Sequence, residues 1–319
     1  MANRAWEDQF LKYFEQSAAD GQRVYTRDEI GAVLSTHGAE FGAPKTLGMM
    51  RLIEFLLRNG HLCEVRLESM ADMPDTATRG ETQGPPTRKA GKEQPPAGSY
   101  GAITRYVWGK ASPYEIGLSL RAGAYLSHAS AMRLHGLGPQ TEIPVYANKE
   151  QSPKPAPTGV LTQGGIDRAF ARPPRVSRYV YSFDGTPLVL LSGKHTGNLG
   201  VNRIVEPSGI PVRVTSLERT LVDVVVRPAY ATGAAAVLEA YRAARERASV
   251  EMLLAILQSL AHVYPYHQAI GFYMERAGYA ASDLRRVHSL GLQYDFYVEH
   301  QMAGAQFDRA WRIHYPEGL

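Results

Sequence analysis

Residues 214–228 read VTSLERTLVDVVVRP, a stretch that combines a helix start, an apolar run and a helix stop. Thr215 and Glu218 have the S/T-x-x-E spacing of a capping box, in which each side chain accepts a backbone N–H. Pro228 cannot continue a helix, because it lacks the N–H donor and restricts the preceding residue. The apolar residues between these signals are Leu217, Leu221, Val222, Val224, Val225 and Val226. They point around most of the helix, so we predict a short helix buried on several sides in a domain core.

Two opposite charges lie inside this predicted helix. Arg219 and Asp223 are one turn apart, which allows an i,i+4 ion pair. Breaking a buried pair by removing one partner costs about 3–5 kcal/mol, so a buried pair would need both residues. The pattern favours a structural role for Glu218, Arg219 and Asp223 in the scaffold of the domain, and it leaves a role in partner binding open.

Length and composition indicate a globular protein with two or three domains. The chain has 319 residues, of which 44% are hydrophobic and 21% are charged. It has neither the apolar core of a signal peptide nor the roughly 18 consecutive apolar residues of a membrane span. Cys63 is the single cysteine, which excludes an internal disulfide and a multi-cysteine zinc site. We therefore expect a cytoplasmic protein that does not bind membranes.

The positive charge is concentrated in the middle of the chain. The net charge is +4, yet residues 1–70 carry eight Lys or Arg and ten Asp or Glu, whereas residues 101–230 carry 15 and eight. Within this basic region, positive side chains cluster at Arg168, Arg172, Arg175 and Arg178. A surface that faces phosphate groups and a merely solvated loop explain this cluster equally well.

The first 68 residues follow the order of three helices and a strand. We expect helices over 5–16, from a capping box at residues 26–29 to about residue 38, and over 45–59, followed by a strand over 61–68. This order is typical of a winged helix-turn-helix, whose third helix enters the DNA major groove; a generic three-helix packing module is the alternative. The candidate DNA contacts on the third helix and the wing are Lys45, Thr46, Arg51, Arg58, Arg66 and Arg105.

Residues 69–100 are rich in Pro, Gly and charged residues and contain almost no large apolar side chain. Such a segment cannot bury enough surface to fold, so we expect it to be disordered. Residues 101–109 have strand character and could pair with residues 62–67, which would make the segment an insertion in the wing. A linker between domains is the other possibility. Residues 110–319 are expected to form a larger mixed domain, which gives an α+β protein.

Residues 112–137 predict two further helices. Ser112 and Glu115 form another capping box, and Ser127 is expected to cap a helix that carries His128 and His135 on one face. Two histidines without a third ligand make a poor zinc site, and Ser127 lacks the surroundings of a nucleophile elbow. We therefore interpret these three residues as packing residues of the scaffold.

Short strands and helices alternate after residue 142. Strand character is expected over residues 143–147, 179–183, 188–191, 212–214, 290–298 and 311–315. Helices are expected over residues 164–170, 234–247, 250–260 and 269–276.

No catalytic or cofactor motif was found in the sequence. A Walker phosphate loop, a dinucleotide-binding glycine fingerprint, an H-E-x-x-H motif and the kinase set are all missing. We therefore predict a protein that is not an enzyme, with no catalytic, cofactor-binding or metal-binding residues. Asp295 and Glu299 suggest the carboxylate pair of a metal-dependent nuclease, but His300 stands where a lysine would be expected. A nuclease or another nucleic-acid-processing enzyme remains the alternative from the enzyme class.

Several blocks of the chain, taken in order, resemble those of AbiEi-family antitoxins. They are residues 125–137, 214–228, 264–279, 294–297 and 311–316. The resemblance covers residues 112–316 and implies an antitoxin of a type IV toxin-antitoxin system that takes part in phage defence. It implies that a winged-helix domain binds double-stranded operator DNA and represses the operon, while the C-terminal domain opposes a nucleotidyltransferase-like toxin. A toxin-interacting protein without DNA binding is a further alternative.

Overall fold

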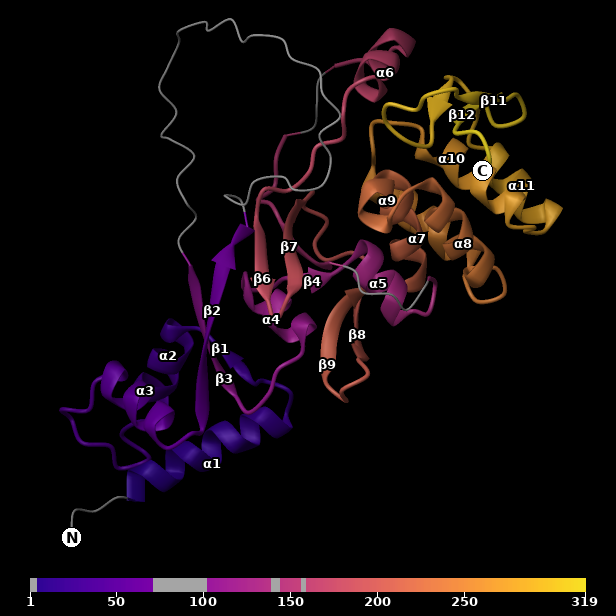
Figure 1. The fold of residues 1–319 in the computed structure, drawn as a ribbon. Coiled ribbons are helices and arrows are strands. Elements are labelled where there is room, and N and C mark those ends of the chain that lie inside the picture. Colours follow the sequence, from indigo (N-terminus) through magenta and orange to yellow (C-terminus); the bar gives the residue numbers. More distant parts are fainter. Residues whose placement is uncertain (1–4, 71–101, 139–143, 156–158) are drawn as a thin grey trace, which may run out of the picture. The chain divides into compact units, whose positions relative to one another are not determined.

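The computed structural model describes residues 5–70, 102–138, 144–155 and 159–319 (Figure 1). The chain divides into two compact units, Met1–Lys110 with Arg178–Pro187 and Ala111–Ser177 with Leu188–Leu319. Each unit combines helices with β-strands, which confirms the expected α+β class. The expected domain boundary near residue 110 lies at the end of the first segment, but residues 178–187 belong to the first unit.

The first unit packs helices against an antiparallel sheet. Its helices are α1 (Ala5–Ala19), α2 (Arg27–His37) and α3 (Met49–Arg58). Its strands lie in the order β1 (Val24–Tyr25), β3 (Ile103–Trp108), β2 (Leu62–Ser69) and β6 (Val180–Phe183). The core between helices and sheet is apolar and includes Phe10, Phe14, Ile30, Leu52, Leu56 and Leu62. The predicted capping box at residues 26–29 is present at the start of α2.

The third helix begins later than the sequence pattern predicts. Residues 44–47 form a turn closed by the N–H of Leu47 and the carbonyl of Pro44 (2.8 Å), and Gly48 is the N-cap. Lys45 and Thr46 therefore precede α3 instead of lying on it. A methyl group on Gly31 would lie 2.8 Å from Sδ of Met49, so the glycine lets α3 begin close against α2.

Strands β2 and β3 pair directly with each other. The antiparallel register runs from Leu62 opposite Trp108 to Leu67 opposite Ile103. Residues 103–108 therefore pair with residues 62–67, as the sequence allowed. This pairing favours an insertion between two paired strands over a linker between domains. Ser69 lies in β2, and residues 71–101, which include most of the expected disordered segment, lie outside the described part of the chain.

The second unit contains a mixed sheet with the strand order β7-β5-β4-β9-β8. The strands are β4 (Tyr125–Leu126), β5 (Val145–Glu150), β7 (Thr186–Gly193, in this unit from Leu188), β8 (Val201–Val205) and β9 (Pro211–Thr215). Strand β5 is parallel to β7, and β4 is parallel to β9. Strand β8 was not predicted, because its residues are mostly half-buried or exposed and lack a strong apolar alternation.

Helices surround α7 and complete the second unit (Figure 1). The helices before and including α7 are α4 (Pro113–Ser119), α5 (His128–Leu134), α6 (Gln163–Phe170) and α7 (Leu217–Val226). A 3-10 turn, Pro228–Ala231, leads to α8 (Ala234–Ala244), α9 (Val250–Leu260), α10 (Tyr266–Arg276) and α11 (Ala281–His288). A small sheet has the order β10 (Phe296–Tyr297), β12 (Ile313–Tyr315) and β11 (Gln306–Asp308). No helix in the described ranges has the length and apolar character needed to cross a membrane.

Helix α7 lies in the core as predicted, but the predicted capping box is wrong. Ser216 is the N-cap, and its Oγ accepts the N–H of Arg219 (3.2 Å). Thr215 cannot cap the helix because it ends β9, where it pairs with Val201 of β8. Glu218 instead accepts the backbone N–H of Ser249 (3.2 Å), which ties α7 to the start of α9.

Candidate functional site

The predicted DNA contacts of the first unit are mostly exposed. The exposed side chains are Lys45, Thr46, Arg51, Arg58 and Arg66. Arg51 and Arg58 are two turns apart on α3, and Glu54 lies between them on the exposed side. The guanidinium of Arg58 lies 3.9 Å from the carboxylate of Glu54. Ion pairs of this exposed kind contribute only about 0–1 kcal/mol, so Arg58 stays available to a stronger partner.

Arg105 is placed differently from the expectation. Its side chain is buried, and its Nη1 donates to the carbonyl oxygen of Thr104 (2.8 Å). Strand β3 is an inner strand with β1 on one side and β2 on the other, which explains why this part of the predicted wing is covered. The burial of Arg105 does not fit an exposed DNA contact.

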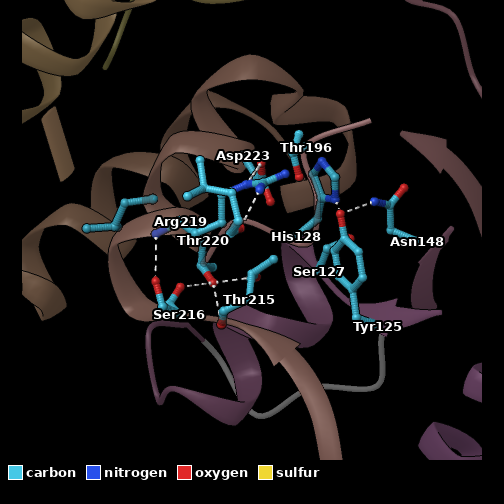
Figure 2. A network of polar contacts seen from close by, with 12 residues as sticks. Tyr125, Ser127, His128, Asn148, Thr196, Thr215, Ser216, Arg219, Thr220 and Asp223 are labelled. Carbon is cyan, nitrogen blue, oxygen red and sulfur yellow. Dashed lines mark hydrogen bonds and ion pairs between the residues drawn. The ribbon is translucent and has the colours of Figure 1, made fainter. Parts of the chain in front are cut away.

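A polar network in the second unit centres on α7 (Figure 2). The predicted ion pair is present, because Nε of Arg219 lies 2.8 Å from Oδ1 of Asp223 and both side chains are buried. Nη1 of Arg219 also donates to the carbonyl of Leu199 (2.7 Å), which precedes β8. Burial lowers the pKa of Arg219, but the charge of Asp223 outweighs it and raises that pKa above its ordinary value. Arg219 thus joins α7 to the segment that precedes β8.

His128 opens α5 in an unusual conformation. Its φ of 51° is in the left-handed region, which residues other than glycine rarely adopt. Its Nδ1 lies 2.9 Å from Oγ of Ser127, so the Ser127 hydroxyl faces the imidazole and does not make the expected cap to the helix. Burial, together with the charges of Arg227 and Arg219, lowers the pKa of His128 to about 3, so the ring is neutral at pH 7.

His135 lies at the other end of α5 and has a different role. Its Nε2 donates to the carbonyl oxygen of Thr215 (2.7 Å), a hydrogen bond that ties α5 to the end of β9. This contact fits the scaffold role expected from the sequence. His128 and His135 therefore serve separate contacts although they share a helix.

A second part of the network follows the ends of β4 and β5. The hydroxyl of Tyr125 accepts from Nδ2 of Asn148 (2.6 Å), while Glu150 accepts the backbone N–H groups of Thr196 (2.9 Å) and Asn198 (3.1 Å). Burial raises the pKa of Glu150, but these hydrogen bonds outweigh that effect and lower it overall. Asn148, Glu150 and Thr196 could not be predicted from the sequence, because isolated Asn, Glu and Thr residues form no recognisable motif.

A cavity of about 770 Å³ lies beside this network within the second unit. Its wall includes His128, Asn148, Arg219 and Asp223 together with residues that follow β7, α6, α7 and α9. The Lys and Arg side chains in the wall are Arg172, Arg175, Lys194, Arg219 and Arg227, whereas the carboxylates are Asp223 and Glu299. The cavity is therefore rich in positive charge.

The two carboxylates of the nuclease alternative are engaged in other contacts. Asp295 accepts from Nε of Arg312 (2.9 Å), and Glu299 accepts the backbone N–H of Ala234 at the start of α8. Across the described parts of the chain, no group of three or more His, Cys, Asp or Glu side chains is placed to hold a metal ion. The geometry therefore gives the nuclease alternative no support.

The fold and these sites define a mixed α+β protein that has an exposed basic helix in one unit and a cationic cavity in the other. Comparison with protein-family models and with curated proteins finds no match. A similar fold occurs in the crystal structure of the RV2827C protein from Mycobacterium tuberculosis, with a TM-score of 0.51 and 14% sequence identity. The similarity covers 97% of this chain and 90% of that chain. At this identity the likeness concerns the fold alone.

Proposed function

We propose that this protein is a DNA-binding transcriptional regulator with antitoxin activity, as its resemblance to AbiEi-family antitoxins implies. The first unit would be the DNA reader. The order of its elements, α1, β1, α2, α3, β2 and β3, is compatible with a winged helix-turn-helix. In that arrangement α3 would be the recognition helix, and β2 and β3 would form the wing. In this proposal the protein acts in the cytoplasm on the operator of its own operon.

The exposed basic side of α3 is the observation that carries the proposal. Arg51 and Arg58 are exposed, whereas Leu52, Ile53 and Leu56 on the other side of the helix are buried in the core. Seven residues of α-helix extend about 10 Å, which corresponds to about three base pairs at 3.4 Å each. The two guanidinium groups can therefore reach separate phosphates or base edges along one groove. Lys45 and Thr46 in the turn before α3, and Arg66 on β2, extend this basic surface.

Local charge matters more here than the charge of the whole unit. Residues 1–70 carry more acidic than basic side chains. Acidic side chains away from the contact surface weaken attraction at long range, where salt screens them with a Debye length of about 8–10 Å. We therefore expect binding that depends strongly on the specific operator and is weak on unrelated DNA.

A mobility-shift assay with DNA from the protein's own promoter tests this proposal. The Arg51→Ala/Arg58→Ala variant should bind at least tenfold more weakly. If both arginines contact phosphates, it should also lower the slope of log affinity against log salt by about 1.8. Lys12→Ala/Arg285→Ala removes the same charge from exposed positions on α1 and α11 and should leave binding unchanged. Unshifted DNA at low salt with folded protein in excess would refute the proposal.

The antitoxin part of the proposal concerns the second unit, to which the resemblance extends. Its expected partner is a nucleotidyltransferase-like toxin encoded beside it. Co-expression with that neighbour tests the proposal, because the full-length protein should restore growth. The Arg51→Ala/Arg58→Ala variant, supplied from an unrelated promoter, should restore growth equally well. Failure of the wild-type chain to rescue growth would reject the antitoxin activity and leave DNA binding to be judged by the mobility shift.

A further inference from the structure

The positive charge of the cavity in the second unit is not balanced by its carboxylates. Asp223 is paired with Arg219 at 2.8 Å, and Glu299 is held by the backbone N–H of Ala234. Among the residues that the structure describes, the four other cations of the wall, Arg172, Arg175, Lys194 and Arg227, form no ion pair with a carboxylate. Four cations around one cavity repel each other, and an anionic ligand would relieve that repulsion.

Three of these cations have side chains that are free to bind. Within the described residues, the guanidinium groups of Arg172, Arg175 and Arg227 make no ion pair and no hydrogen bond. That of Arg227 lies over the Tyr230 ring, 5.9 Å from its centre, and its charge also acts on the carboxylate of Asp223. Lys194 differs, because its Nζ donates to the carbonyls at the end of α9. Guanidinium groups match the geometry of phosphate oxygens, to which they can donate two parallel hydrogen bonds.

The same cavity also offers aromatic rings and an unused polar atom. Tyr230, Tyr264 and Tyr266 line it together with His262. Nε2 of His262 is buried and has no hydrogen-bond partner in the described part of the chain. Burial together with the charge of Lys194 lowers the pKa of this histidine to about 4. Buried polar atoms are rarely left unpaired, so this nitrogen is suited to a polar group of a ligand. Aromatic rings favour a flat ligand group.

We propose that this cavity binds a nucleotide, with its phosphates held by Arg172, Arg175 and Arg227 and its base placed among the tyrosine rings beside His262. A volume of about 770 Å³ lies in the range of about 300–1,000 Å³ that is usual for small-molecule sites. Asn148 and Gly193 place part of the wall at the ends of the parallel strands β5 and β7. Ligands commonly bind beyond the carboxyl ends of such strands. The site is separate from the proposed DNA contacts of the first unit.

Calorimetric titration of the full-length protein tests the assignment. The probes are ATP, GTP, tripolyphosphate, adenosine and guanosine. At least one of the two nucleotides should bind with a dissociation constant below 1 mM. Tripolyphosphate and the matching nucleoside should each bind at least tenfold more weakly, because tripolyphosphate lacks the base and the nucleoside lacks the phosphates. The variant Arg172→Ala/Arg227→Ala should weaken nucleotide binding by at least tenfold.

The matched control is Arg285→Ala/Arg286→Ala, which removes two exposed arginines from α11 in the same unit but outside the cavity. It should bind the nucleotide like the wild-type protein. Both variants change exposed side chains, and unchanged circular dichroism confirms that each is folded. The proposal would be overturned if neither ATP nor GTP bound at 1 mM. Equal affinity of the two double variants for the nucleotide, or equal affinity of the wild-type protein for tripolyphosphate and the nucleotide, would also overturn it.

Discussion

Replacing Asp223 by alanine should strongly destabilise the second unit. The substitution removes the carboxylate partner of the buried Arg219 guanidinium, whereas the hydrogen bond from that guanidinium to the carbonyl oxygen of Leu199 is retained. Loss of one partner from a buried ion pair costs about 3–5 kcal/mol. The retained hydrogen bond to Leu199 and the adjoining cavity, which admits water, place the expected loss at the lower end, about 3 kcal/mol.

A double variant separates the ion pair from simple loss of packing. The variant Arg219→Met/Asp223→Leu removes both charges and fills the space with apolar side chains. Its free energy of unfolding should therefore be higher than that of Asp223→Ala by at least about 1 kcal/mol. The exposed pair of Arg242 with Glu239 provides the control, because Glu239→Ala should cost no more than about 1 kcal/mol.

Urea unfolding followed by tryptophan fluorescence measures these differences. The chain has three tryptophans, and Trp6→Phe/Trp108→Phe leaves the buried Trp311 as the reporter of the second unit. All variants are compared in that background, and an unchanged dependence on urea shows that the same transition is measured. A loss for Asp223→Ala below about 1 kcal/mol, or equal to that of the double variant, would refute the account of the pair as a buried, mutually dependent contact.

Two further predictions concern the same unit. A methyl group on Gly271 would lie 2.0 Å from the ring of Trp311, so Gly271→Ala should destabilise the unit by about 1–3 kcal/mol through overpacking. A methyl group on Gly159 would meet no described residue within 4 Å, so Gly159→Ala should have little effect in the same urea assay. Equal stability of the two variants would contradict this packing. The pKa of His128 is depressed to about 3. The contribution of its neutral ring to the stability of the unit is therefore complete above pH 6.5 and is lost as the pH falls toward 3. Between pH 7 and pH 5, the free energy of unfolding of the wild-type unit should fall by about 2 kcal/mol more than that of the His128→Asn variant. Asparagine also tolerates a positive φ, and both proteins retain His262, whose pKa is lowered in a similar way. Parallel pH profiles would show that His128 is not buried as a neutral ring.

The helix starts show which features can be predicted from local sequence. The capping box of Ser112 and Glu115 is present as predicted, with the hydroxyl and the carboxylate both bonded to the backbone. The equivalent prediction for Thr215 and Glu218 fails although the spacing is the same. Thr215 is fixed by the pairing of β9 with β8, whose strand signal is weak. A local motif therefore predicts a contact only where no distant segment competes for the same residue.

The two candidate sites differ in how far their residues lie from one another in the sequence. Arg51 and Arg58 could be found from a helical pattern because both lie on one helix. The cavity combines side chains from segments far apart in the chain, such as Asn148, Lys194 and His262. The arginine cluster around Arg172 is a local signal, and the structure places Arg172 and Arg175 of that cluster in the wall of the cavity. Sequence patterns indicate such charges, but the three-dimensional fold determines which of them face one another.

The arginines of the cavity can now be divided by their contacts into two functional classes. Arg219 is buried and bonded on two sides, so its removal should change stability before it changes binding. Arg172 and Arg227 are exposed and form no ion pair with any described residue, so their removal should leave stability nearly unchanged. A nucleotide should raise the unfolding midpoint of the wild-type unit by mass action and raise that of Arg172→Ala/Arg227→Ala much less. An equal rise in both proteins would place the bound nucleotide somewhere other than this cavity.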